Sequence, residues 1–259
     1  MKQEMMEIVN QVELAPRIFE MTLKGELTQE MVTPGQFIHI RVPREDLLLR
    51  RPISLAEINH DNQTCKIIYR VEGDGTRAFS HCQIGDKLDC LGPLGNGFDI
   101  SMIEEEDVVY VIGGGIGVPP LYELGRRLKE KGANIYFLNG FASKDVMYYE
   151  KEFSELGSLF IATDDGSYGT HGHVGMLIDD VSKKTTKPKA IYACGAPGLL
   201  KAVESTFSDH PHVYLSMEER MACGVGACYA CVCQSKKDPN VNKKVCDEGP
   251  IFKAGEVII

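Results

Sequence analysis

Short segments in which apolar and polar residues alternate fill the first hundred residues of the chain. They lie at residues 6–12, 18–23, 37–42, 53–58, 66–71 and 87–90. Glycine, proline and aspartate separate them, and none has a helical period. Alternation with a period of two is typical of strands buried on one face. The pattern therefore predicts six antiparallel strands over residues 1–100, closed as a small barrel or packed as a sandwich.

The pattern changes after residue 106. A continuous apolar run at residues 108–112 is typical of a strand that is buried on both faces, and a helical stretch follows at residues 121–131. Further apolar runs at residues 135–138, 159–162, 191–193 and 213–215 alternate with helical stretches. This alternation predicts a Rossmann-like parallel α/β domain over residues 101–215.

A glycine-rich turn joins the first of these strands to its helix and reads Gly115-x-Gly117-x-x-Pro120. Glycines allow a tight turn and the close approach of a pyrophosphate to a helix start, where proline is also favourable. A purely structural turn is the alternative. Because strand, turn and helix occur in the expected order, we favour nucleotide binding.

Two later loops follow strands of the same domain, at residues 163–167 and 194–198. Open α/β sheets bind ligands at the carboxyl ends of their strands, so Asp165, Cys194 and Gly195 are candidate nucleotide contacts. Neither loop contains lysine or arginine to pair with a 2′-phosphate, which favours NAD(H) over NADP(H). Lys144 and Arg126, from outside these loops, are the alternative partners for a 2′-phosphate.

Charge and composition narrow the class of protein. The net charge of −9 over 259 residues argues against nucleic acid or an anionic membrane surface as a partner. The amino terminus has no apolar core of signal-peptide length, and no apolar run approaches the length of a membrane span. Nine cysteines without a secretion signal suggest a reducing cytoplasm.

The carboxyl-terminal region contains a cysteine motif of distinctive spacing. Cys223, Cys228 and Cys231 stand at gaps of four and two residues, and Cys246 follows after a loop. This spacing is typical of a plant-type 2Fe–2S cluster. Structural zinc prefers two short cysteine or histidine pairs, and disulfides suit a secreted chain, so both alternatives fit less well. Residues 216–259 are therefore predicted to form a small cluster-binding domain.

Polar residues stand at two strand ends of the first half. One group is Arg50-Arg51-Pro52-Ile53-Ser54, and the other runs from Ile68-Tyr69-Arg70 to Gly75-Thr76. An arginine near a serine suits a diphosphate, as do backbone amides at a helix start. Solvated surface charges are the alternative.

Together these motifs resemble the ferredoxin–NADP reductase superfamily. The resemblance implies a six-stranded antiparallel β-barrel that binds FAD and an α/β domain that binds the nicotinamide nucleotide. The cysteine extension makes the whole chain similar to the electron-transfer subunits of B-type dihydroorotate dehydrogenase. By this likeness, FAD binds Arg51, Pro52, Ile53, Ser54, Ile68, Tyr69, Arg70, Gly75 and Thr76. NAD(H) binds Gly115, Gly117, Pro120, Asp165, Cys194 and Gly195, and the cluster binds Cys223, Cys228, Cys231 and Cys246. Ile53 stands where the superfamily usually has an aromatic residue on the flavin ring, and Tyr69 is a candidate to flank that ring.

The resemblance also implies a function and a partner. A catalytic subunit with FMN oxidises dihydroorotate in pyrimidine biosynthesis, and electrons pass through the cluster and FAD to NAD. The expected assembly is a heterotetramer with two copies of each subunit. Rival hypotheses are the flavin and iron–sulfur subunit of an NADH-dependent ferredoxin–NADP oxidoreductase or a sulfide dehydrogenase, and a zinc-stabilised docking module.

Overall fold

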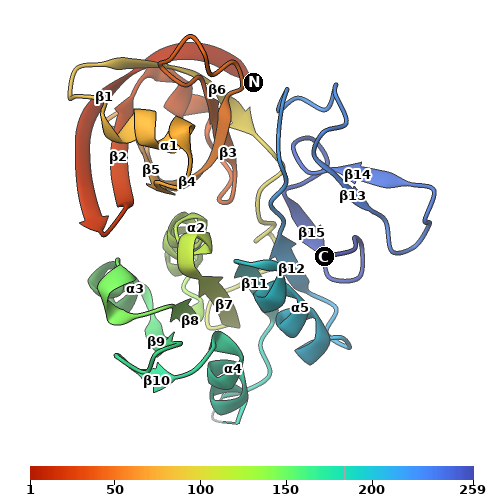
Figure 1. The fold of residues 1–259 in the computed structure, drawn as a ribbon. Helices are drawn as coiled ribbons and strands as arrows, with labels where there is room; N and C mark the ends of the chain where they lie inside the picture. Colours follow the sequence, from red (N-terminus) through yellow and green to blue (C-terminus); the bar gives the residue numbers. More distant parts are fainter. Residues whose placement is uncertain (184) are drawn as a thin grey trace.

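The computed structural model describes residues 1–183 and 185–259 and contains a closed barrel, a seven-stranded sheet and a two-stranded hairpin (Figure 1). The strands are β1 (Lys2–Ala15), β2 (Ile18–Lys24), β3 (Phe37–Ile40), β4 (Arg51–Asn59), β5 (Thr64–Arg70), β6 (Lys87–Leu94), β7 (Val108–Gly114), β8 (Asn134–Phe141), β9 (Ser158–Thr163), β10 (Thr170–His171), β11 (Ala190–Cys194), β12 (Val213–Ser216), β13 (Val232–Gln234), β14 (Asn242–Lys244) and β15 (Ile251–Lys253). The helices are α1 (Asp74–Ser80), α2 (Pro120–Glu130), α3 (Glu150–Leu156), α4 (Val174–Ser182) and α5 (Pro197–Thr206), and the 3-10 turns are η1 (Glu26–Glu30), η2 (Gly115–Gly117) and η3 (Lys144–Val146).

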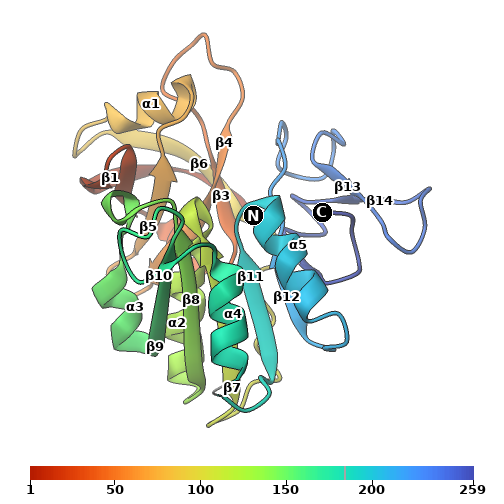
Figure 2. The ribbon, with the colours of Figure 1, turned by 60° about the horizontal axis from the view of Figure 1, so that its bottom comes forward.

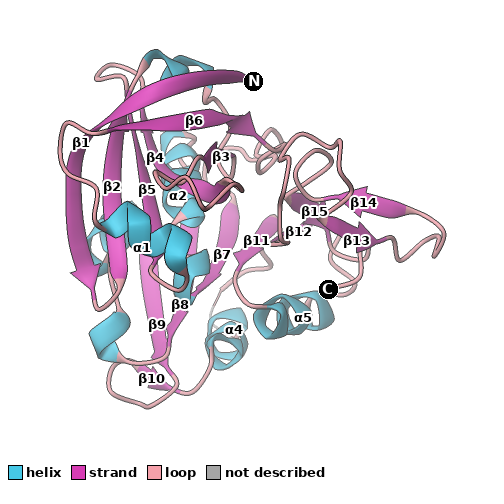
Figure 3. Ribbon diagram, turned by 45° about the horizontal axis from the view of Figure 1, so that its top comes forward, coloured by secondary structure: helices cyan, strands magenta, loops and turns pink. Residues whose placement is uncertain are grey.

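The amino-terminal half is a six-stranded antiparallel barrel with the order β1-β2-β5-β4-β3-β6. All six predicted strands are confirmed. Alternate residues point inward, as in β3, where Ile38 and Ile40 join the barrel core. Helix α1 contributes the fully buried Phe79, which packs edge-on against Tyr69 at 6.0 Å between ring centroids. Helix α1 therefore covers part of the barrel core (Figure 3).

The second half is a doubly wound α/β unit with the strand order β10-β9-β8-β7-β11-β12-β15. The strands from β10 to β12 are parallel. Helices α2 and α3 pack with Val109 and Val111 on one face, whereas α4 and α5 pack with Tyr110 and Ile112 on the other. The predicted Rossmann-like arrangement is confirmed, and β7 lies in its centre (Figure 2).

The carboxyl-terminal segment is less separate than the sequence suggested. Strand β15 pairs antiparallel with β12 at the edge of the large sheet, with Ile251 opposite Ser216. The β13–β14 hairpin projects beyond the β12–β15 edge of that sheet (Figure 3). The segment predicted to bind the cluster thus shares its framework with the nucleotide domain.

Polar contacts join the barrel to the α/β unit. The buried carboxylate of Glu123 on α2 accepts a hydrogen bond from the backbone N–H of Ile58 at 3.1 Å, and Arg126 donates to the carbonyl of Ile58 at 3.1 Å. Tyr149 donates to the buried carboxylate of Glu20 on β2. These contacts orient the carboxyl ends of the parallel strands toward the barrel. Among the described residues, no helix is long and apolar enough to span a membrane.

Candidate functional site

The four predicted cluster ligands come together beside the barrel. The thiol of Cys223 interacts with that of Cys228, and Cys231 interacts with Cys246. The backbone N–H of Cys246 donates to the Cys231 sulfur at 3.4 Å. A 2Fe–2S cluster takes two thiolates on each iron, so this pairing fits the group.

Backbone amides of the cysteine loop point at the sulfurs. The N–H of Val225 donates to Cys223 at 3.4 Å, and the N–H of Gly226 donates to Cys246 at 3.2 Å. Burial raises the pKa of Cys223, but the amide of Val225, the thiol of Cys228 and the amides of Cys228 and Ala227 together lower it to about 7. Gly224 and Gly226 allow the loop to turn in this way because their φ angles are +72° and +75°. The loop thus stabilises the thiolate of Cys223, whereas burial raises the pKa of Cys246 to about 12 despite the Gly226 amide.

The cysteine set reaches from the interior to the surface. Cys231 and Cys246 are each 2% exposed, whereas Cys228 is exposed. Next to it on the same loop, the apolar side chains of Val225 and Tyr229 are 39% and 63% exposed. A cluster on these four thiolates would therefore lie near solvent on the Cys228 side.

Hydrogen bonds from a residue just after the last barrel strand hold the carboxyl-terminal part of this segment. Asn96, just after β6, donates to the carbonyls of Glu248 at 2.8 Å and Ile251 at 3.1 Å. It also accepts from the N–H of Ile251 at 3.3 Å. The sequence reasoning missed Asn96, because a polar residue in a Gly-rich turn carries no signal of a distant partner.

Two of the predicted flavin contacts meet at one point. A Cβ on Gly75 would lie 2.6 Å from Nε of Arg51, so the guanidinium of β4 packs directly on the start of α1. Arg51 also donates to the carbonyl of Leu49 at 2.7 Å. Pro52, Ile53 and Ser54 follow on β4, all partly exposed. The hydroxyl of Thr76 accepts from the N–H groups of Glu72 and Gly73 and so shapes the turn before α1.

The second predicted group, at the end of β5, divides between two faces. Tyr69 is 1% exposed, stacks on Phe19 and hydrogen-bonds Gln11, so its ring lies inside the barrel. The suggestion that this ring flanks the flavin is therefore wrong, and only the backbone of Tyr69 is left for a ligand. Ile68 instead packs toward the α/β unit, and Arg70 forms an ion pair with Glu72. Alternation along β5 gave the signal, since Arg70 and Tyr69 must face opposite ways.

The predicted nucleotide loops touch through their backbones. A Cβ on Gly117 would lie 2.5 Å from the carbonyl oxygen of Cys194 and 2.6 Å from the nitrogen of Gly195, so only glycine fits there. Gly115 has a φ of +53°, and a Cβ built on it would meet nothing within 4 Å. Pro120 is buried in the first turn of α2, as expected. The structure thus brings the turns after β7 and β11 together at one edge of the sheet.

A tyrosine that the sequence reasoning did not single out completes this edge. Tyr148 donates to the carbonyl of Gly115 at 2.8 Å. Burial is the main cause that raises the pKa of Tyr148; the nearby Cys194 adds to the shift and Arg70 opposes it. Strand β5 also contacts the η2 turn, so its end, which carries a proposed flavin contact, lies beside the nucleotide turns.

Asp165 lies apart from these turns, on the loop after β9. Its carboxylate accepts from the N–H and the hydroxyl of Ser167 at 3.0 and 2.6 Å, which lowers its pKa. The N–H of Lys144 donates to the Ser167 hydroxyl at 2.8 Å, so Lys144 stands next to this loop. Arg126 is instead held by Glu123 at the domain junction. Of the two cations considered for a 2′-phosphate, only Lys144 borders the loop.

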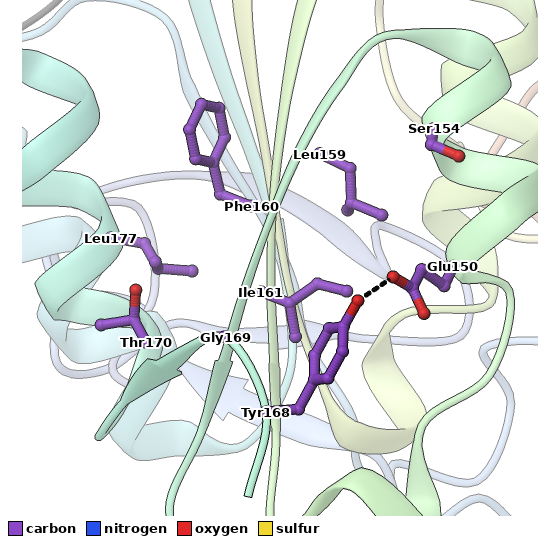
Figure 4. A pocket seen from close by; sticks show the side chains of 9 residues that line it. All are labelled: Glu150, Ser154, Leu159, Phe160, Ile161, Tyr168, Gly169, Thr170 and Leu177. Atoms are coloured by element: carbon purple, nitrogen blue, oxygen red, sulfur yellow. Dashed lines mark hydrogen bonds between the residues drawn. The ribbon is translucent and has the colours of Figure 1, made fainter. Parts of the chain in front are cut away.

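An open depression of about 450 Å³ lies on the side of the sheet, between α3, β9 and α4 (Figure 4). Tyr168 and Glu150 hydrogen-bond across its rim. Its lining is Glu150, Ser154, Leu159, Phe160, Ile161, Tyr168, Gly169, Thr170 and Leu177. None of the predicted site residues is among them, so this depression is separate from the predicted cofactor sites.

Comparison with known proteins assigns each region. Residues 6–98 match the oxidoreductase FAD-binding domain, and residues 111–205 match the oxidoreductase NAD-binding domain. Residues 218–258 match the iron–sulfur cluster binding domain of dihydroorotate dehydrogenase B. The electron transfer subunit of dihydroorotate dehydrogenase B (NAD(+)) from Enterococcus faecalis is 60% identical over 100% of this chain and 99% of that protein. The chain belongs to this family.

The family assignment extends to other relatives. The corresponding subunit from Streptococcus mutans is 52% identical over 99% of this chain and 98% of its own length. Members of this family are oxidoreductase subunits with FAD-binding, NAD-binding and iron–sulfur domains, and this chain has all three. The match at residues 218–258 decides against the zinc-stabilised docking module.

A solved structure has a similar fold over nearly the whole of this chain. It comes from work on flavin-based electron bifurcation by NADH-dependent reduced ferredoxin–NADP oxidoreductase. The TM-score is 0.87 at 27% identity, over 98% of this chain and 90% of that one. An NADH-dependent ferredoxin–NADP oxidoreductase is the first rival hypothesis from the sequence. The identity to the dihydroorotate dehydrogenase subunits is about twice as high over the same span.

Proposed function

We propose that this chain connects the FMN of a dihydroorotate dehydrogenase catalytic subunit to NAD⁺ through a 2Fe–2S cluster and FAD, in pyrimidine biosynthesis. The observation that carries the proposal is the position of the four thiols. The segment that carries them is bound to the barrel side through Asn96 and joins the sheet of the nucleotide domain through β15. A flavin exchanges both hydrides and single electrons, which is the chemistry that links a nicotinamide to an iron–sulfur cluster.

For the flavin we propose the surface at the ends of β4 and β5. Arg51 supplies a charge for the diphosphate, and its packing on Gly75 brings the backbone of Gly75 and Thr76 to the same place. Pro52, Ile53 and Ser54 on one strand, and Ile68, the Tyr69 backbone and Arg70 on the other, border the ring system. Strand β5 contacts the η2 turn, so this surface lies next to the nucleotide turns.

For the nucleotide we propose the edge formed by the turns after β7 and β11. Gly115 and Gly117 expose backbone at the start of α2, and Cys194 and Gly195 lie against them. Pro120 fixes the first turn of that helix. Asp165 and its Ser167-braced loop border the adenosine side and favour NAD(H), because a carboxylate repels a 2′-phosphate.

For the partner we propose an FMN-containing catalytic subunit, with two copies of each chain in a cytoplasmic heterotetramer. The exposed edge of the cysteine loop, with Val225 and Tyr229 beside Cys228, is the side that would face it. Exposed apolar side chains next to a redox centre suit a contact that excludes water. The net charge of this chain is −9, which does not favour binding to nucleic acid.

The test is reconstitution with the catalytic subunit. The chain is expressed with and without that subunit, purified, and analysed for FAD, iron and sulfide. Dihydroorotate-dependent reduction of NAD⁺ is expected only in the complex, with NADH-dependent reduction of artificial acceptors in the isolated chain. Activity with ferredoxin and NADP⁺ in place of dihydroorotate and NAD⁺ would support the ferredoxin–NADP oxidoreductase instead.

A further inference from the structure

One histidine of the barrel faces the cysteine loop and has no role in the assignments above. His39 on β3 is 0% exposed. Phe37, two residues earlier on the same strand, packs in the core shared with Cys231 and Cys246, whereas Ile38 and Ile40 point into the barrel. Alternation therefore directs His39 out of the barrel, toward the carboxyl-terminal segment.

The imidazole of His39 lies directly on the cysteine loop. A Cβ on Gly224 would lie 2.5 Å from Nδ1 and 3.1 Å from Cε1 of His39, so glycine is required for the ring to fit. Gly224 is the neighbour of Cys223, the first proposed cluster ligand. The ring thus touches the backbone that presents a cysteine to the cluster.

The backbone of His39 belongs to the proposed flavin site. It pairs with Pro52 on β4, between the pairs of Arg51 and Ile53. Arg50 donates to the carbonyl of His39 at 3.2 Å and to that of Asp89 at 2.8 Å, which fixes this part of β3. One residue therefore joins the strand proposed for the flavin to the loop proposed for the cluster.

Backbone groups of Arg50 and Cys223 lie near the ring of His39, but neither lies in hydrogen-bonding geometry with a ring nitrogen. Within residues 1–183 and 185–259, neither Nδ1 nor Nε2 has a hydrogen-bond partner. A buried polar atom without a partner costs about 1–3 kcal/mol, so native proteins rarely keep two of them on one side chain. An acceptor atom of a bound group would satisfy a ring N–H. A flavin oxygen or nitrogen and a cluster sulfur are the two sources that this position offers.

We propose that His39 is a positioning residue for electron transfer between the two cofactors, which holds the Cys223 loop against the flavin strand and donates a ring N–H to a cofactor acceptor. The inference rests on the proposed function. Its consequence is that the distance and coupling between flavin and cluster depend on a residue outside both sequence motifs.

The experiment compares purified, cofactor-loaded complexes of the wild type, His39→Phe and His39→Gln. Phenylalanine keeps a ring and removes both nitrogens, whereas glutamine keeps an N–H donor. Three readouts are taken: the flavin absorption spectrum, the EPR spectrum of the reduced cluster, and the rate of electron exchange between them after rapid mixing with NADH. We expect His39→Phe to slow exchange about tenfold or more, because small displacements of reacting groups have effects up to about 10²-fold. His39→Gln should recover part of the rate.

The two spectra identify the acceptor. A shift in the EPR spectrum alone assigns a cluster sulfur, and a shift in the flavin spectrum alone assigns the flavin. His60→Leu is the matched control, because His60 is a barrel histidine that contacts the carbonyl of Met31 at 2.8 Å and should leave all three readouts unchanged.

A second pair of variants tests the contact from the loop side. Gly224 and Gly226 have similar positive φ angles, but a Cβ on Gly226 would meet Asp247 rather than His39. Gly224→Ala should therefore slow exchange more than Gly226→Ala. This pair carries the test if His39→Phe does not fold.

The outcomes separate the two proposals. Failure of the wild type to bind FAD and a 2Fe–2S cluster would overturn the proposed function. A wild type with both cofactors, together with a folded His39→Phe that matches it in both spectra and in rate, would overturn only the role of His39. So would equal exchange rates in Gly224→Ala and Gly226→Ala.

Discussion

The carboxylate of Glu123, which is fully buried on α2, accepts the backbone N–H of Ile58 on β4 at 3.1 Å. The same carboxylate forms ion pairs with Arg126 at 2.8 Å and with Arg127 at 2.7 Å. A side chain of the nucleotide domain thus completes the backbone hydrogen bonding of a barrel strand. The two domains are fixed by a charged group that cannot be removed without leaving a buried donor unpaired.

We expect Glu123→Ala to destabilise the protein by about 3 kcal/mol, the lower end for a broken buried ion pair, because both arginines are partly exposed. NADH should also reduce the bound flavin more slowly, since the domains lose their common orientation. Urea unfolding and stopped-flow bleaching measure the two effects. Glu123→Gln keeps an acceptor for Ile58 and should lie between the wild type and the alanine variant; equal stability of all three would contradict the role of this contact.

Asn96 gives a test of the carboxyl-terminal segment alone. Asn96→Ala removes three hydrogen bonds to residues 248–251, each worth about 0.5–1.5 kcal/mol. The cluster should bleach faster under a chelator, with flavin content unchanged. Asn62→Ala serves as the control. Asn62 lies in the β4–β5 turn, distant in sequence from that segment, and it donates to Asn59 through its backbone N–H, which alanine keeps. Equal bleaching of the Asn96 variant and the wild type would show that β15 alone holds the segment.

The fold was predictable because its signals are local. Alternation over residues 18–23 and the continuous run at 108–112 each report burial on one or both faces, and the structure confirms the strands there. Strand β15 was missed because three residues at the edge of a sheet show no period. The cysteine spacing is also local, and the family match at residues 218–258 confirms the cluster domain.

Contacts between distant segments left no such signal. His39 occupies a strand position that is indistinguishable by pattern from a solvated one, and its neighbour Gly224 comes from the other end of the chain. The inward position of Tyr69 could have been found, since Arg70 beside it must face the other way. The individual flavin and nucleotide contacts remain predictions.

Arg51→Ala should weaken FAD retention and leave the cluster spectrum intact. Loss of a hydrogen bond to a charged group costs roughly 1.5–3 kcal/mol, or about ten- to a hundredfold in affinity. Flavin content after gel filtration measures the effect. Arg44→Ala is a suitable control, because Arg44 pairs with Asp46 on the exposed loop before β4. Full retention of flavin by the Arg51 variant would remove this arginine from the diphosphate site.

NADH should reduce the bound flavin much faster than NADPH. The loop after β9 presents Asp164 and Asp165, and the Asp165 carboxylate is held by Ser167. Stopped-flow bleaching with each nucleotide gives the ratio directly. Equal rates would mean that a cation receives the 2′-phosphate, and Lys144, whose N–H bonds Ser167, would be the residue to replace next.

Cys228→Ser separates the role of the cluster from that of the flavin. Serine offers a hard hydroxyl that suits this iron poorly, so the variant should lose or alter its cluster. Hydride transfer from NADH occurs within the chain and should persist with artificial acceptors, whereas exchange with the FMN subunit should collapse. Cys233→Ser is the matched control, because Cys233 is buried near Glu219 and is not a proposed ligand. Gel filtration must show that the variant still assembles, because Cys228 lies on the exposed edge proposed for the partner. An assembled, iron-free variant that still couples dihydroorotate oxidation to NAD⁺ reduction at the normal rate would refute the relay.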